Sequence, residues 1–179
     1  MNSRELLNAL SVAERLKDTT RHCYTSKGRH ESVAEHSWMM TLMAFFMRDE
    51  FPDVDMDKVI RMCIIHDLGE CFTGDIPTFD KKQVHEDIEE NLLFNWIDTL
   101  PSYYAEEMKA LYNEMTERKT VEAKIYKAID SLEASDLSTW IPKEYKLNLT
   151  YADDRVSFSE YLTTLRQAIR EDTLAKIEK

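Results

Sequence analysis

Five histidines are the first candidates for chemistry in this 179-residue chain, because imidazole binds transition metals and exchanges protons near neutral pH. Helical periodicity places His36 in the middle of an apolar stripe with Val33, Met40, Met43 and Met47. The His36 side chain should therefore point into the core. Its position alone fits two interpretations: a core histidine bound to a carbonyl, or a ligand in a buried site.

A second candidate is the dipeptide His66–Asp67, which we expect at the end of a helix that buries Val59 and Met62. Adjacent side chains on a helix point about 100° apart, so they can share one ion only near a helix terminus. Gly69 is expected to provide that terminus. A His-Asp dipeptide also occurs often by chance, so this pair is weak evidence by itself.

The third candidate, Asp130, lies in a predicted long helix whose apolar stripe includes Val121, Ile125 and Ile129. Asp130 lies on a neighbouring face of this helix together with Glu133, and a helix in this part of a compact chain should pack on two faces, which would bury Asp130. A buried, unpaired carboxylate is costly. Asp130 therefore needs a cation, a hydrogen-bond donor or a metal ion, and a metal ion would satisfy it.

Taken together, these residues offer two imidazole nitrogens and two carboxylates. Such a mixed donor set suits Mn, Co, Fe, Ni or Zn better than Ca or Mg, which prefer oxygen ligands. Four protein ligands would leave room on the ion for a water molecule and a phosphate oxygen, and such a water is a nucleophile near neutral pH. We therefore expect one divalent transition metal bound by His36, His66, Asp67 and Asp130.

The elements that position these residues are predicted to be helices. The chain has only three Gly and four Pro, which argues against the many tight turns of a β protein. The motif S-V-A-E at 32–35 is a capping box that should begin a helix. We predict an all-α fold, a single-domain compact bundle of about six to eight helices over residues 1–179. The helices are expected at residues 5–16, 32–49, 56–68, 82–99, 101–115, 120–140 and 157–177, with irregular segments at 18–31 and 69–80.

The composition excludes several classes of partner. With 23 Lys and Arg against 34 Asp and Glu, the net charge of −11 argues against binding a nucleic-acid polymer. The three cysteines, Cys23, Cys63 and Cys71, show no zinc-ribbon spacing and no disulfide framework. The N-terminus lacks an apolar signal segment and no apolar run approaches 18 residues, so we expect no membrane association and a cytoplasmic location.

The order His36, His66-Asp67, Asp130 resembles the H…HD…D signature of the HD-domain superfamily of metal-dependent phosphohydrolases. The surrounding segments are similar to those of its 5′-deoxynucleotidase-like subgroup, and H-D-x-x-E-x-x-x-x-D-I-P is the specific part. The resemblance covers residues of about 15–140 and implies the HD-domain fold, with the helix at 157–177 packing on it. The segments are RHESVAEHS at 29–37, IIHDLGECFTGDIP at 64–77 and KAIDSLEA at 127–134.

The same resemblance implies two catalytic carboxylates, Glu70 and Asp75, beside the metal ligands. Glu70 would orient or deprotonate the attacking water, or protonate the leaving oxygen, and Asp75 is the other candidate for the general acid. Other interpretations are a solvent-exposed carboxylate at a helix C-terminus for Glu70 and an ordinary turn residue after Gly74 for Asp75.

Arg21 stands where the related nucleotidases carry an arginine that contacts the substrate, and a guanidinium suits phosphate oxygens. His22 replaces a tryptophan of the related enzyme at this substrate-binding position, which leaves the base and sugar preference open.

The implied function is hydrolysis of a nucleoside 5′-monophosphate, preferably deoxy, by a metal-activated water, in a homodimer. The alternatives are an HD-type hydrolase of a cyclic or pyrophosphate nucleotide, and a nucleotide-binding sensor without catalysis.

Overall fold

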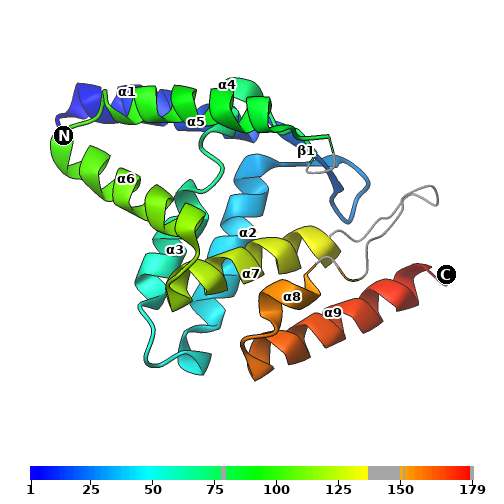
Figure 1. Cartoon of the computed structure of the whole chain (residues 1–179). Helices are drawn as coiled ribbons and strands as arrows, with labels where there is room; N and C mark the ends of the chain where they lie inside the picture. The colour runs from blue at the N-terminus through cyan, green and yellow to red at the C-terminus, as the bar shows by residue number, and fades with distance from the viewer. Residues whose placement is uncertain (78–79, 137–149, 151, 178–179) are drawn as a thin grey trace.

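The computed structural model describes residues 1–77, 80–136, 150 and 152–177, and these confirm the predicted all-α fold (Figure 1). None of the described helices combines the length and the apolar character that a membrane crossing requires. The end of the helix predicted at 120–140 lies outside the described residues, from residue 137 on. In chain order the elements are α1 Ser3–Ala13, η1 Glu14–Lys17 (a 3-10 helix), β1 Thr20–Tyr24, β2 His30–Ser32, α2 Val33–Phe46, η2 Arg48–Glu50 (3-10), α3 Met56–Ile65, α4 Glu70–Thr73, α5 Gln83–Ile97, α6 Ser102–Glu117, α7 Val121–Asp136, α8 Asp153–Val156 and α9 Glu160–Ile177.

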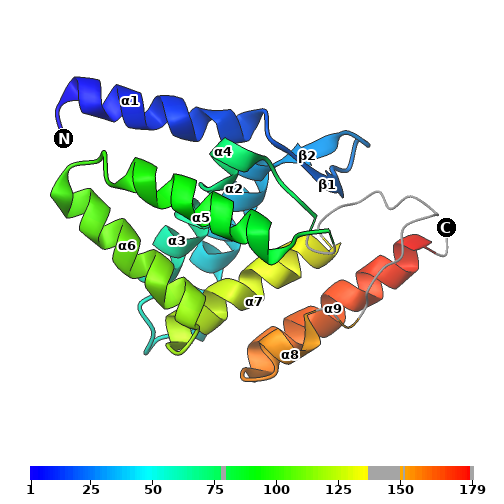
Figure 2. The ribbon, with the colours of Figure 1, turned by 45° about the horizontal axis from the view of Figure 1, so that its top comes forward.

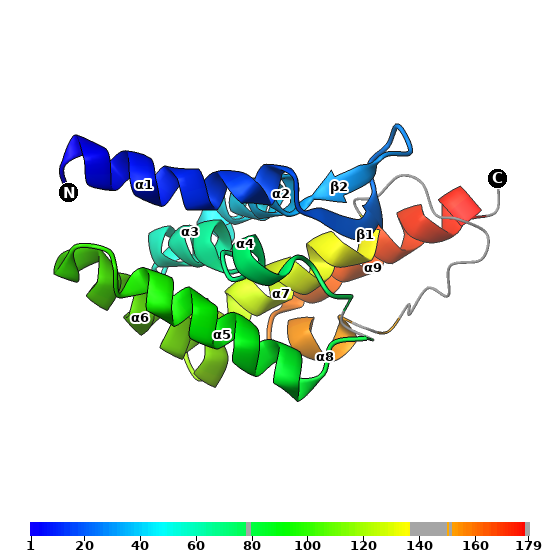
Figure 3. The same ribbon diagram turned by 90° about the horizontal axis from the view of Figure 1, so that it is seen from above.

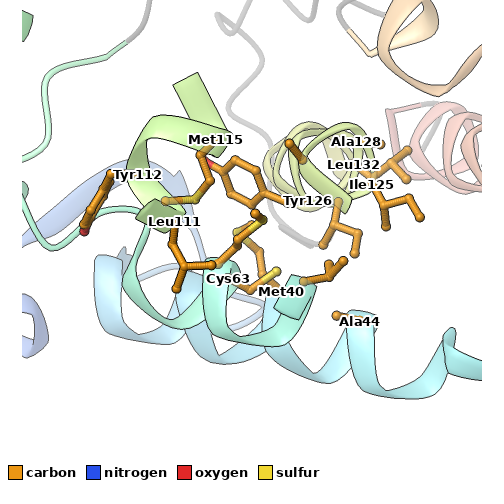
Figure 4. Close-up of a cluster of buried hydrophobic side chains, with 14 of the residues drawn as sticks. Met40, Ala44, Cys63, Leu111, Tyr112, Met115, Ile125, Tyr126, Ala128 and Leu132 are labelled. Carbon is orange, nitrogen blue, oxygen red and sulfur yellow. The ribbon is translucent and has the colours of Figure 1, made fainter. Parts of the chain in front are cut away.

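The centre of the molecule is formed by α2, α3 and α7, which pack against one another. The predicted stripe on α7 is buried from Ile125 onward, with Ile125, Ile129 and Leu132 fully inaccessible, whereas Val121 at the helix start is 40% exposed. Figure 4 shows side chains of α2, α3, α6 and α7 meeting in one apolar cluster. Each large apolar side chain buried in this way contributes about 1.5–3 kcal/mol. The rigid contact of these three helices matters because each carries one part of the candidate site.

The remaining helices surround this centre. Viewed from above, α5 and α6 lie along one side of α3 and α4, and α1 lies along the other side (Figure 3). The C-terminal helix α9 packs against α7 and α8. The single-domain organisation stays a prediction.

The capping box predicted at 32–35 is present at the start of α2. The backbone N–H of Glu35 donates to Ser32 Oγ at 3.3 Å, and the backbone N–H of Ser32 donates to Glu35 Oε2 at 2.9 Å. Two of the unpaired N–H groups at the helix start are thereby satisfied. The cap fixes where α2 begins and therefore which turn carries His36.

The prediction of an irregular segment at 18–31 is wrong, because an antiparallel hairpin of β1 and β2 occupies most of it. Its register pairs Thr20 with Ser32 and Tyr24 with His30. Gly28, with φ of 78°, permits the left-handed backbone of the turn. The strands are short and largely polar, so no apolar alternation marked them. In Figure 2 the hairpin lies near the end of α7, which brings Arg21 of β1 toward the site.

The expected role of Gly69 as the end of a helix over 56–68 is also wrong. The helix α3 ends at Ile65, and Gly69 has a right-handed φ of −58° at the start of the short helix α4. A Cβ at Gly69 would lie 2.7 Å from Cγ of Glu89 on α5, so close approach explains this glycine. Gly74, with φ of 77°, ends α4, and the segment 69–80 is therefore not wholly irregular.

Candidate active site

Two imidazoles face each other at the junction of α2 and α3. His36 on α2 is 1% exposed, and His66 follows directly after the last residue of α3. Their Nε2 atoms lie 3.3 Å apart. His66 Nδ1 donates to the Cys63 carbonyl at 3.0 Å, which requires the proton on Nδ1 and leaves the Nε2 lone pair available. The prediction that His36 points into the core is confirmed.

Two carboxylates reach the same point from different elements. Asp67 Oδ2 lies 2.9 Å from His66 Nε2 and 3.8 Å from His36 Nε2. Asp130 Oδ1 on α7 lies 3.4 Å from His36 Nε2. The four residues singled out in the sequence, which span 94 positions from 36 to 130, therefore converge in space.

This arrangement fits a single divalent ion. Two nitrogens bound to one ion at about 2.1 Å would stand about 3.0–3.4 Å apart for bond angles of about 90–110°. The distance of 3.3 Å between the Nε2 atoms of His36 and His66 falls in that interval. The ligand atoms of His36, His66 and Asp67 also lie within 4.8 Å of one another. The mixed nitrogen and oxygen donors match transition ions.

Local charge keeps the two carboxylates ionised. Burial alone would raise the pKa of Asp130, but the Lys127 ammonium, 2.5 Å from Asp130 Oδ2, and a hydrogen bond with His36 hold this pKa well below its usual range. Burial acts against Asp67 in the same way, and the charge and hydrogen bond of His66 lower the pKa of Asp67 to about 2. Both side chains are thus available as anionic ligands at neutral pH.

Glu70 lies beside this cluster, on the first turn of α4. It is 7% exposed, so the interpretation as a solvent-exposed carboxylate at a helix C-terminus is wrong. Burial, and then the negative charges of Asp67 and Asp75, raise the pKa of Glu70 to about 9. A cation at Asp67 would oppose this shift. A raised pKa that a cation lowers toward neutral suits an acid or base beside the site.

Asp75 follows Gly74 and pairs with His22. Asp75 Oδ2 lies 3.9 Å from His22 Nδ1, and its side chain is 12% exposed. The interaction with Asp75, followed by a contact with Cys23, raises the pKa of His22 to about 9. The structure thus brings together one predicted catalytic residue and one predicted substrate-binding residue, which sequence spacing did not suggest.

Arg21 on β1 is 9% exposed and is held by two carboxylates. Its Nη1 lies 2.9 Å from Glu31 Oε2 and 3.2 Å from Glu133 Oε2. Glu133 also accepts a hydrogen bond from His36 Nδ1. No role for Glu133 follows from the sequence, although its spacing of three residues from Asp130 places both side chains on one face of the helix.

A protein-family model described as an HD domain matches residues 13–172. The chain belongs to the HD domain family. Among curated proteins it is similar to the 5′-deoxynucleotidase HDDC2 of Homo sapiens, with 31% identity over 136 residues, 73% of this chain and 65% of that protein. It is also similar to the 5′-deoxynucleotidase hdd1 of Schizosaccharomyces pombe, with 30% identity over 132 residues, 69% of this chain and 66% of that protein. The matches thus span slightly less than two thirds of these relatives.

A solved structure with the same fold is a predicted metal-dependent phosphohydrolase from Magnetospirillum magnetotacticum MS-1. It superimposes with a TM-score of 0.75 at 26% identity, covering 96% of this chain and 94% of that one. The likeness therefore extends over nearly the whole length of both chains.

Proposed function

We propose that this protein is a metal-dependent phosphomonoesterase that hydrolyses nucleoside 5′-monophosphates, preferably deoxy, to nucleoside and phosphate. The observation that carries the proposal is the convergence of His36, His66, Asp67 and Asp130, with buried Glu70 beside them. The names of the similar 5′-deoxynucleotidases and of the similar phosphohydrolase structure support this choice of substrate and reaction.

We assign the role of metal ligands to His36, His66, Asp67 and Asp130, for one ion of Mn, Co, Fe, Ni or Zn. When bound, the divalent ion supplies a Lewis acid that stabilises charge on phosphoryl oxygens and strengthens water as a nucleophile. The chain orients its own ligands: the Cys63 carbonyl holds His66, and the Lys127 ammonium holds Asp130.

The proton transfers are assigned to the two remaining carboxylates. Burial and the negative charge of Asp67 raise the pKa of Glu70, so this carboxyl group can orient the attacking water or exchange a proton with it. Asp75 is the second candidate for donating a proton to the leaving 5′-oxygen, and His22 is positioned to set the orientation of its carboxyl group.

We assign phosphate recognition to Arg21. Its Nη1 is tied to Glu31 and Glu133, and neither of these contacts uses Nη2. The two carboxylates fix the plane of the guanidinium before substrate arrives, which reduces the entropy lost on binding. His22, whose side chain is 30% exposed beside Asp75, is the residue of this strand that would contact the sugar or base.

A homodimer and a cytoplasmic location are also part of the proposal. Trp38, Phe45 and Phe46 on α2 are 58%, 51% and 75% exposed, which is unusual for aromatic side chains and would suit a protein interface. The three cysteines are free, as in a reducing compartment. Light scattering on the purified protein measures the oligomeric state, and imaging of the tagged protein shows its location in the cell.

The experiment is phosphate release from a panel of ribo- and deoxyribonucleoside 5′-monophosphates with Mn or Co, using wild type, Glu70→Gln and Glu106→Gln. Glu106 is an exposed glutamate on α6 and is the matched control. We expect release with wild type and Glu106→Gln, and its loss in Glu70→Gln. Release only from cyclic or pyrophosphate nucleotides would change the assigned substrate class but leave the assigned active site unchanged. Binding of nucleotides without any release would make the protein a sensor.

A further inference from the structure

One carboxylate oxygen of α7 contacts two parts of the site that lie about a hundred residues earlier in the chain. Glu133 on α7 is 4% exposed, and its Oε2 accepts a hydrogen bond from His36 Nδ1. The same oxygen lies 3.2 Å from Nη1 of Arg21, which is 112 residues away in the chain. His36 belongs to the proposed metal site and Arg21 to the proposed phosphate site, so Glu133 contacts both.

The contact with His36 decides which imidazole nitrogen faces the ligand cluster. An ionised carboxylate can only accept hydrogen bonds, so the Nδ1 of His36 must carry a proton. The other nitrogen, Nε2, then points toward His66 and Asp130, at 3.3 and 3.4 Å. A carboxylate that accepts a hydrogen bond from the other ring nitrogen of a ligating histidine also makes the imidazole a stronger metal ligand.

The contact with Arg21 decides where the guanidinium lies. Arg21 is 9% exposed, so its charge has left most of its water. Burial of such a charge is tolerated when carboxylates pair with it, and Glu133 and Glu31 provide that pairing at 3.2 and 2.9 Å. Glu133 in turn accepts hydrogen bonds from two donors, Arg21 and His36.

We propose that Glu133 is a positioning residue. It orients His36 with Nε2 toward the metal and fixes the position of the Arg21 guanidinium relative to the metal site. The proposal rests on the proposed function for the roles of His36 and Arg21. It goes beyond that function because it names the group that couples the metal site to the phosphate site, through one oxygen atom.

A competing interpretation is a second metal ion bound by Glu31, His36 and Glu133, whose donor atoms lie within 4.8 Å of one another. The Arg21 guanidinium argues against it. Its Nη1 is already 2.9 Å from Glu31 and 3.2 Å from Glu133, so it supplies the positive charge of this cluster. A divalent cation added there would be repelled by Arg21 and would have to displace it.

Metal binding tests the first half of the proposal. Calorimetric titration with Zn²⁺ compares wild type, Glu133→Gln, Glu133→Ala and the matched Glu31→Gln, which alters an Arg21 partner without removing the His36 acceptor. We expect zinc affinity to fall about 10-fold in Glu133→Gln and up to about 100-fold in Glu133→Ala, the range seen for partners of metal ligands. Glu31→Gln should change it by less than about 3-fold. A role in packing alone predicts wild-type affinity for the isosteric Glu133→Gln, and that result would overturn the proposal.

The imidazole itself provides a readout that does not depend on activity. In ¹⁵N-labelled, zinc-loaded wild type, we expect His36 to coordinate through Nε2 and to keep its proton on Nδ1. Coordination through Nδ1 would refute the proposal even if the Glu133 variants failed to fold, because this measurement uses the wild-type chain. It would leave the proposed hydrolase intact.

Kinetics test the second half on the substrate found in the nucleotide panel. Because Glu133 holds Arg21, Glu133→Gln at saturating metal should raise KM several-fold, and Glu31→Gln should also raise KM while leaving zinc affinity near wild type. If Glu133→Gln left KM unchanged, Arg21 would not depend on Glu133 and the coupling would be disproved. If no nucleotide is turned over, the calorimetric and ¹⁵N results still decide the role of Glu133 at the metal.

Discussion

His36 and His66 present their Nε2 atoms to each other at 3.3 Å, although the residues come from different helices. The opposite nitrogen of each ring, Nδ1, donates a hydrogen bond, in His36 to Glu133 and in His66 to the Cys63 carbonyl. The two donors are therefore fixed by folding, before any ion binds. Such preorganisation reduces the reorganisation needed for metal binding.

Metal removal should lower stability because the ligands join α2, the end of α3 and α7. At a metal concentration of about 100 times Kd, binding stabilises the folded state by about 2.7 kcal/mol. For a chain of this size we expect the melting temperature to rise by roughly 5–10 °C on adding Mn or Zn, since each kcal/mol corresponds to about 2–4 °C. Differential scanning fluorimetry with and without EDTA measures the shift.

The matched variant for this prediction is His66→Ala. It removes one Nε2 donor from the cluster and should abolish most of the metal-dependent shift. An equal shift in His66→Ala and wild type would mean that the ion binds elsewhere.

Glu70→Gln should separate catalysis from metal binding. The amide cannot exchange a proton as the buried Glu70 carboxyl group can, so we expect kcat to fall by about 10²–10⁴-fold. Glu70 is not one of the four proposed ligands, so the metal-dependent rise in melting temperature should remain. Steady-state kinetics and fluorimetry on the same preparation check both. Loss of the thermal shift together with kcat would instead place Glu70 in the metal shell.

The local parts of this structure could be predicted because they depend on neighbouring residues. The stripe around His36 placed its ring in the core, and the capping box at Ser32 and Glu35 located the start of α2. The convergence of His36 with Asp130 could be anticipated only from the cost of burying a carboxylate and from the resemblance to a family.

The parts that were missed depend on contacts between distant residues. Glu133 contacts His36 across 97 positions of sequence, and its spacing of three residues from Asp130 indicates only a shared face of α7, not that contact. Gly69 predicts a helix terminus because glycine is frequent there, whereas its actual constraint is the close approach of Glu89, 20 residues later. The hairpin of β1 and β2 is polar, so it lacked the alternation by which strands are recognised.

The ion pair of Glu35 with Arg29 predicts a pH-dependent contribution to stability. The Arg29 hydrogen bond, with help from Ser32, lowers the pKa of Glu35 to about 2. Because the folded pKa lies below the unfolded value of about 4.3, the contribution is complete above that pH and is lost as pH falls toward 2. Glu35 is 39% exposed, so water screens the pair and we expect only about 0.5–1 kcal/mol at pH 7.

Urea unfolding of wild type and Glu35→Gln at pH 7 and pH 3 measures this contribution. The difference between the two proteins should shrink to less than half at pH 3. Glu106→Gln, on the exposed face of α6, is the control. A difference that stayed constant between the two pH values would show that the charge of Glu35 does not matter and that only its capping geometry does.

The packing at Gly69 predicts a mutation whose effect changes sign with its neighbour. The φ of −58° at Gly69 suits alanine, so without a steric clash Gly69→Ala would stabilise the fold by about 0.4–1 kcal/mol, because it reduces the conformational entropy of the unfolded chain. The new Cβ would, however, lie 2.7 Å from Cγ and 3.0 Å from Oε1 of Glu89, and overpacking of this kind costs about 1–3 kcal/mol. We therefore expect Gly69→Ala to be destabilising in wild type and stabilising in a Glu89→Ala background.

A double-mutant cycle by urea unfolding tests this prediction. Glu90→Ala, which changes an exposed neighbour on α5, is the control background, and Gly69→Ala should remain destabilising in it. Equal destabilisation in all three backgrounds would mean that the glycine is required by something other than the approach of Glu89.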